Sequence, residues 1–141
     1  MKKIAFYALV LVCFSTANAE LVQAQTVGLR VDVPFNFNVA EKVLPAGQYL
    51  ILAPQGGTLR ISGPNGSAAV AMTNQISGAR PLGGAGAIVF NCYGSRCFLS
   101  QFWTARSEVG QEMPKSRPEK DLESEKQQLA VVTLKAKATQ N

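Results

Sequence analysis

Apolar and polar residues alternate strictly over residues 27–39. Every odd position of this segment is apolar, while the even positions carry glycine, arginine, aspartate, proline and asparagine. A period of two places one face of an extended strand in a core and the other in water. Pro34 has no N–H to donate to a strand ladder, so we expect it to mark a sheet edge, a bulge or a switch between two sheets.

Shorter strand-like patterns fill most of the remaining chain, and turns rich in Pro, Gly and Asn separate them. In the pattern at 67–74, we expect Val70 and Met72 to point into the core. About seven or eight short antiparallel strands predict an all-β domain, either a β-sandwich or a small barrel. The further strands are expected at residues 48–53, 58–62, 67–74, 87–93, 96–104 and 129–136.

Two segments depart from the strand pattern. Residues 77–86 hold four glycines and a proline, which predicts a flexible loop. Ser116-Arg117-Pro118-Glu119 fits a capping box with proline in the first turn, which predicts a short charged helix over about 117–126. Leu122 is the only apolar anchor of this helix, so we expect the helix to lie loosely on the surface.

The N-terminus has the pattern of a signal peptide. Two lysines precede an apolar run at residues 4–14, and small residues then offer cleavage after Ala19 or Ala24. The run is shorter than the roughly 20 residues that a membrane span needs. Cys13 lies inside it and is expected to leave with the signal. We therefore predict an exported protein, periplasmic or extracellular, with a single domain at 25–141 and no stable membrane span after cleavage.

The composition narrows the function classes. The chain has no histidine, which removes the commonest general base and the commonest metal ligand. From residue 20 onward, 12 basic and 9 acidic residues leave a net charge of +3, without a basic cluster. A scattered charge of this size favours solubility over nucleic-acid binding, and an exported protein rarely meets nucleic acid. We predict no enzyme activity and no cofactor or metal.

Cys92 and Cys97 flank the sharpest local motif. Between them, Gly94-Ser95 suits a two-residue hairpin loop with glycine at the first position of a type II′ turn. The two cysteines would then face each other as a non-hydrogen-bonded pair, at a Cα separation of roughly 4.5 Å that a disulfide can bridge. A structural bridge is favoured, since a redox pair usually has C-x-x-C spacing and a zinc site wants four ligands.

Two carboxylates supply an alternative. Asp32 and Glu41 are the only acids within residues 25–107, and paired carboxylates can hydrolyse glycosides. A histidine-free envelope hydrolase is therefore one alternative. A small outer-membrane β-barrel is another, although its strands need about 9–11 residues and several strands here are shorter.

Aromatic residues could stack on sugars or anchor a partner; Tyr49, Tyr93, Phe102 and Trp103 are the candidates. Alternation over residues 98–103 puts bulky side chains on both faces of the strand, as is typical of a central strand. This pattern favours a core position for Trp103 over a binding platform.

Four motifs resemble a group of small secreted bacterial proteins of the acidobacterial type. They are Val-Pro-Phe-Asn-Phe at 33–37, Leu-Pro-Ala-Gly-Gln-Tyr at 44–49, Phe-Leu-Ser-Gln-Phe-Trp at 98–103 and Glu-Met-Pro-Lys-Ser at 112–116. The resemblance implies a recurring exported β domain and transfers no catalytic residue. The equivalent hairpin in this group often lacks cysteines, which would make the bridge a stabiliser and not the shared function.

These observations predict an exported, non-enzymatic β domain that binds an envelope protein or glycan, or serves a structural role there. Its oligomeric state is left open. Long loops carry function more often than strands do, so contacts are expected at 77–86 and 105–118. The candidate contact residues are Arg80, Trp103 and Arg106.

Overall fold

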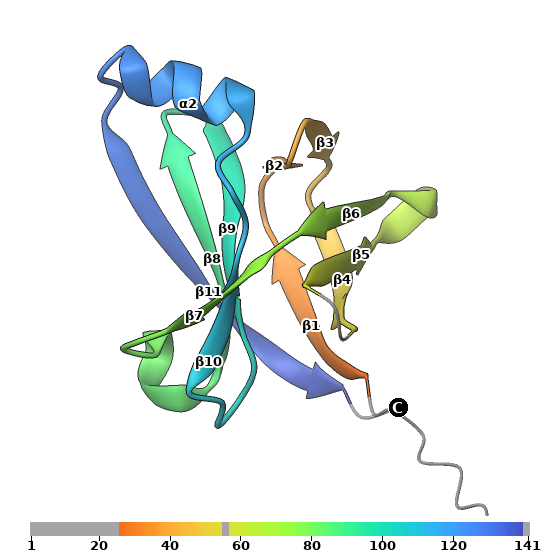
Figure 1. Cartoon of the computed structure of the whole chain (residues 1–141). Coiled ribbons are helices and arrows are strands. Elements are labelled where there is room, and N and C mark those ends of the chain that lie inside the picture. The colour runs from red at the N-terminus through yellow and green to blue at the C-terminus, as the bar shows by residue number, and fades with distance from the viewer. Residues whose placement is uncertain (1–25, 55–56, 140–141) are drawn as a thin grey trace, which may run out of the picture.

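The computed structural model describes residues 26–54 and 57–139 (Figure 1). The proposed signal peptide, its cleavage sites and Cys13 lie outside these residues. The described chain forms one eleven-stranded sheet with a short helix near its C-terminal end, α2 (Arg117–Ser124). The strands are β1 (Val27–Val33), β2 (Phe37–Val39), β3 (Lys42–Leu44), β4 (Gly47–Ala53), β5 (Thr58–Ser62), β6 (Ala68–Met72), β7 (Asn74–Ser77), β8 (Gly86–Tyr93), β9 (Arg96–Trp103), β10 (Val109–Glu112) and β11 (Leu129–Thr139).

The sheet curls into a nearly closed barrel, so the all-β prediction is confirmed in its barrel form. Nine strands follow the order β3-β2-β9-β8-β11-β1-β4-β5-β6. Past Thr73, β6 continues into β7, which pairs with β10, and β10 returns to β9. The edges of β3 and β6 are not joined by a ladder. One hydrogen bond, from Lys42 Nζ to the Ala68 carbonyl, crosses this opening, which we call the seam.

Pro34 marks a switch between two parts of the sheet, one of the three outcomes expected for it. Before it, β1 pairs with β4 and β11; after it, β2 pairs with β3 and β9. The β2–β9 pair is parallel, which corrects the expectation of a wholly antiparallel sheet. The alternation predicted the inward face correctly from Leu29 to Val39. Phe35 is partly buried, and the other odd-numbered residues of this range are buried: Leu29, Val31, Val33, Phe37 and Val39.

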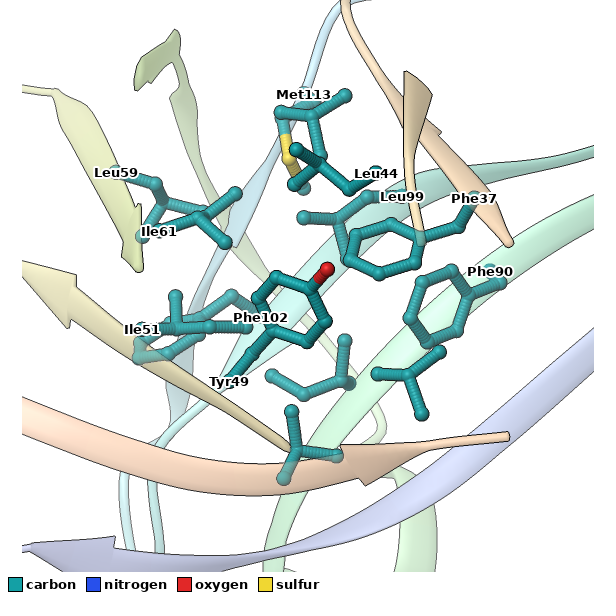
Figure 2. Close-up of a cluster of buried hydrophobic side chains, with 14 of the residues drawn as sticks. Phe37, Leu44, Tyr49, Ile51, Leu59, Ile61, Phe90, Leu99, Phe102 and Met113 are labelled. Carbon is teal, nitrogen blue, oxygen red and sulfur yellow. The ribbon is translucent and has the colours of Figure 1, made fainter. Parts of the chain in front are cut away.

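Aromatic rings fill the middle of the barrel. Figure 2 shows Phe37 between Tyr49 and Phe90, with ring centroids 5.0 and 5.4 Å apart in edge-to-face geometry. Such pairs add about 0.5–1.5 kcal/mol to the burial of their area. The Tyr49 hydroxyl donates to the Pro45 carbonyl at 2.6 Å, so this buried polar atom is satisfied. The core therefore holds β2, β4 and β8 together by packing.

The expected inward face of β6 is wrong. Val70 and Met72 are 64% and 76% exposed, whereas Ala71 and Thr73 are buried. Pairing with β5 sets the register, and the Thr73 N–H reinforces it by donating to the Gly57 carbonyl at 2.7 Å. Alanines stand on both faces of this strand, so hydrophobicity alone pointed to its larger residues.

The cysteine hairpin forms as predicted. Cys92 pairs with Cys97 across β8 and β9, and the two are joined by a disulfide with a Cα separation of 4.0 Å. Gly94 has φ +62°, the sign that a type II′ turn requires at its first central residue. The bridge therefore joins two adjacent strands near their connecting turn.

The segment at 77–86 is more ordered than a flexible loop. β7 extends to Ser77, and Pro81–Gly84 form a short 3₁₀ turn. The Arg106 N–H donates to the Gly84 carbonyl at 3.0 Å, which ties the turn to the segment after β9. The segment at 105–118 likewise contains β10, which pairs with β7, so its first part lies beside the 77–86 turn, whereas the residues after β10 run along the barrel to α2 at the opposite end (Figure 1).

Helix α2 begins where the sequence predicts but lacks the expected capping box. Ser116 makes no side-chain cap, and Glu119 turns inward to accept a hydrogen bond from Asn91 Nδ2 at 3.0 Å. Glu119 and Leu122 are 4% and 9% exposed. The helix therefore has a polar anchor and an apolar anchor, and the expectation of a loose surface helix is wrong.

Candidate functional site

The three residues expected to contact a partner do not form one site. Trp103 is 3% exposed, and its indole N–H donates to Gln101 Oε1 at 2.9 Å. Its ring covers Gly110, where an added Cβ would lie 2.6 Å from a ring carbon. Trp103 is therefore a core residue, as the alternation favoured, and its expected role as a partner contact is corrected.

Arg80 and Arg106 are exposed at the end of the barrel formed by the two tied segments. A shallow hollow of ≈ 470 Å³ includes Arg80 but not Arg106 in its lining, which consists of residues 77–80, Glu108 and Val109. Its described lining contains only exposed or half-buried residues. This hollow therefore offers surface charge, and no buried polar group within its lining orients a ligand.

Asp32 and Glu41 are not brought together by the fold. Asp32 lies on the exposed face of β1, opposite Gln48, and Glu41 lies in the turn between β2 and β3. Glu41 lines a surface hollow beside Lys42, but the lining of that hollow does not include Asp32. The arrangement gives the paired-carboxylate hydrolase no support.

A groove runs along β6 beside the seam. Its outer part, ≈ 580 Å³, lies between the residues 39–42 and 68–70. Its inner part, ≈ 290 Å³, shares Ala40 and Val70 with the outer part, so we treat the two as one seam groove. The inner part is lined by Asn38, Ala40, Val70, Ala71, Met72, Phe98, Leu99, Met113, Pro114, Ser116 and Glu119.

The outer edge of β6 is unpaired along this groove. Backbone groups in an antiparallel strand alternate between its two edges. The Thr73–Gly57 bond shows that the backbone N–H and C=O groups of the odd-numbered residues face β5. The carbonyl of the even-numbered Ala68 faces the seam instead. Val70 and Met72 therefore direct their N–H and C=O groups to the groove side, where no described residue bonds to them.

A polar cluster forms the far end of the groove. Glu119 accepts from Asn91 at Oε1, whereas no described residue bonds to Oε2. The hydroxyls of Ser116 and Tyr93 are buried and have no hydrogen-bond partner in the described chain. Buried polar atoms without partners cost stability, so this end of the groove is costly unless something binds there.

Lys115, which precedes Ser116 in the chain, forms an ion pair with Glu123 and not with this cluster. Lys115 Nζ contacts Glu123 Oε1 at 2.7 Å, and this hydrogen bond raises the pKa of Lys115. Burial, and then the charge of Glu119, raise the pKa of the Tyr93 hydroxyl. The described residues therefore contain no ion pair for the buried Glu119 carboxylate.

Sequence reasoning missed the groove for two reasons. The Ser116–Glu119 spacing indicated a capping box, which would have turned Glu119 toward the helix N-terminus. The apolar character of Val70 and Met72 indicated a core position. A usable signal was the pair of alanines at 69 and 71, which suit the tightly packed inner face of a strand.

Within residues 26–54 and 57–139, no three Cys, Asp or Glu side chains gather as metal ligands. In the same ranges, no helix is long and apolar enough to cross a membrane. Comparison with protein-family models, with curated proteins and with solved structures found no match to this chain. The geometry of the seam groove is therefore the basis for assigning a function.

Proposed function

We propose that this protein is an exported, non-enzymatic binding domain that takes an extended peptide segment of an envelope protein into the seam groove. The peptide adds a strand to the outer edge of β6. The observation that carries the proposal is the unpaired backbone of Val70 and Met72 along the groove. An extended peptide supplies alternating N–H and C=O groups at the same spacing, so it satisfies them.

The side chains around the free edge favour the same ligand. Val70 and Met72 are large, apolar and exposed, and apolar side chains of a peptide strand would pack against them. Each backbone hydrogen bond formed adds about 0.5–1.5 kcal/mol net. Natural proteins usually protect a free edge that carries exposed apolar residues, which makes this edge a pairing site.

A protein partner is favoured over a glycan by the positions of the aromatic residues. Tyr49, Tyr93, Phe102 and Trp103 are all buried, so none of them offers a ring face for stacking on a sugar. Export is supported by the signal-like N-terminus and by the Cys92–Cys97 bridge, since disulfides persist in oxidising compartments.

Proline scanning of β6 tests the proposal. Random ten-residue peptides displayed on phage are selected on immobilised residues 25–141, and the selected clones are then assayed on variants. Val70→Pro removes an N–H from the outer edge only, so we expect the fold to persist and binding to fall at least tenfold. Arg80→Ala, at the other end of the barrel, should leave binding unchanged.

Ala71→Pro is the matched control for the direction of the edge. It removes an N–H that bonds to β5, so we expect it to lower the free energy of unfolding by about 1–3 kcal/mol, which Val70→Pro should not do. Clones that bind Val70→Pro as well as the original protein would contradict the proposal. A selection that yields no specific clone would also contradict it.

A further inference from the structure

The buried carboxylate of Glu119 has no counter-charge paired with it among the described residues. It is 4% exposed and lines the inner part of the seam groove, yet the groups beside it, the Asn91 amide that donates to it and the Tyr93 hydroxyl, are both neutral. A buried carboxylate without a counter-charge is costly, because the interior solvates it poorly. A buried polar group that the protein leaves without full partners inside a cavity is a candidate for ligand recognition.

Lys115 forms no ion pair with Glu119 and acts on it only as a nearby charge. Its ammonium group forms a 2.7 Å pair with Glu123, and both side chains of this pair are substantially exposed, at 39% and 52%. The cavity beside Glu119 is therefore left with a carboxylate and the unpartnered hydroxyl of Ser116. Both groups can accept a hydrogen bond, which suits a donor-rich cation.

The other lining residues of the cavity are apolar except Asn38, whose side-chain amide donates to the Cys97 carbonyl. Leu99, Met113 and Phe98 are buried at its base, and Met72 forms part of its rim. Figure 2 shows Leu99 and Met113 close together beside the core aromatics. A cavity of ≈ 290 Å³ with apolar walls and a carboxylate at one end matches a side chain with an aliphatic stem and a charged head.

We infer that this end of the groove binds the ammonium group of a lysine side chain on the bound peptide. The four-carbon stem would lie against the apolar walls, and the three N–H donors would meet Glu119 Oε2 and Ser116 Oγ. This inference deepens the proposed function, on which it rests, by specifying which residue the peptide must carry next to the β6 edge.

An amine probe tests the pocket without a peptide backbone. Residues 25–141, labelled with ¹⁵N, are titrated with n-butylammonium chloride at constant ionic strength, and n-butanol serves as the uncharged control. We expect saturable shifts of the Asn91 side-chain amide and the Ser116 backbone amide with n-butylammonium only. Glu119→Gln, which keeps shape and removes charge, should weaken this response at least tenfold.

A second variant keeps the test decisive if Glu119→Gln does not fold. Lys115→Gln changes a half-exposed residue and removes a competing cation, so n-butylammonium should bind several-fold more tightly. Equal shifts with n-butanol, no saturable shift, or no effect of either variant would overturn the lysine pocket. If Val70→Pro weakens peptide binding but n-butylammonium gives no response, only the lysine pocket is rejected. If n-butylammonium binds but Val70→Pro leaves peptide binding unchanged, only strand addition is rejected.

Discussion

At the scale of single residues, close contacts decide which positions tolerate change. Gly110 lies under the Trp103 ring in β10, and an added Cβ would sit 2.6 Å from the indole. We expect Gly110→Ala to lower the free energy of unfolding by about 1–3 kcal/mol, because the rigid ring must move. Chemical denaturation followed by Trp103 fluorescence measures this loss.

Gly78 provides the matched control for that variant. An added Cβ there meets nothing within 4 Å, and its φ lies outside the left-handed region. Gly78→Ala should therefore be neutral or slightly stabilising. If the two variants have equal stability, Trp103 does not pack on Gly110 as described.

Removing the buried, unpartnered hydroxyl of Tyr93 should stabilise the protein. Tyr93→Phe removes an unsatisfied atom, so we expect it to raise the free energy of unfolding at pH 7 by roughly 1 kcal/mol. Tyr49→Phe should lower it by about 0.5–1.5 kcal/mol, because the Tyr49 hydroxyl donates to Pro45. Urea denaturation of both variants measures the difference in sign.

Tyr93 also makes the free energy of unfolding depend on pH in the alkaline range. The pKa of Tyr93 is raised above its ordinary value of 10.0 in the folded protein, first by burial. The folded state therefore holds this proton more tightly than the unfolded state does. Tyr93 imposes no ionisation penalty on folding below pH 10.0, and stability is lost as pH rises from there through the folded pKa. Above pH 10, stability should fall less steeply in Tyr93→Phe, and parallel slopes would contradict this.

At the scale of elements, the β8–β9 hairpin combines a turn, a pairing register and a disulfide. Replacing Cys92 and Cys97 with alanine should lower the free energy of unfolding by about 2 kcal/mol, since the bridge closes a short loop in the unfolded chain. Residues 25–141, denatured without reductant, should show no free thiol. Two titratable thiols would contradict the bridge.

Alternation and turn chemistry predicted the elements whose faces differ strongly. Residues 27–39 carry large apolar groups on one face only, so their inward side was readable, and Gly94-Ser95 determined the hairpin and its bridge. The prediction for β6 was wrong because alanines lie on both faces of the strand and its register comes from hydrogen bonds with β5. The expected capping role of Glu119 was wrong because its burial depends on Asn91, a residue distant in the sequence.

At the scale of the whole molecule, the barrel is complete except at the seam. β6 and β7 follow one another along the chain, yet β7 has a partner in β10, whereas β6 lacks a described partner on its outer edge. The groove, the exposed Val70 and Met72, and the buried Glu119 all belong to this opening. None of these features was visible in the spacing of the sequence, because the opening arises from how distant strands meet.

Amide hydrogen exchange of residues 25–141, measured by NMR with and without a selected peptide, tests the open edge most directly. In the free protein, we predict rapid exchange at Val70 and Met72 and slow exchange at Ala69 and Ala71, whose N–H groups bond to β5. Bound peptide should slow exchange at Val70 and Met72 at least tenfold. Equal protection at all four amides in the free protein, or no gain on binding, would contradict an open β6 edge that accepts a strand.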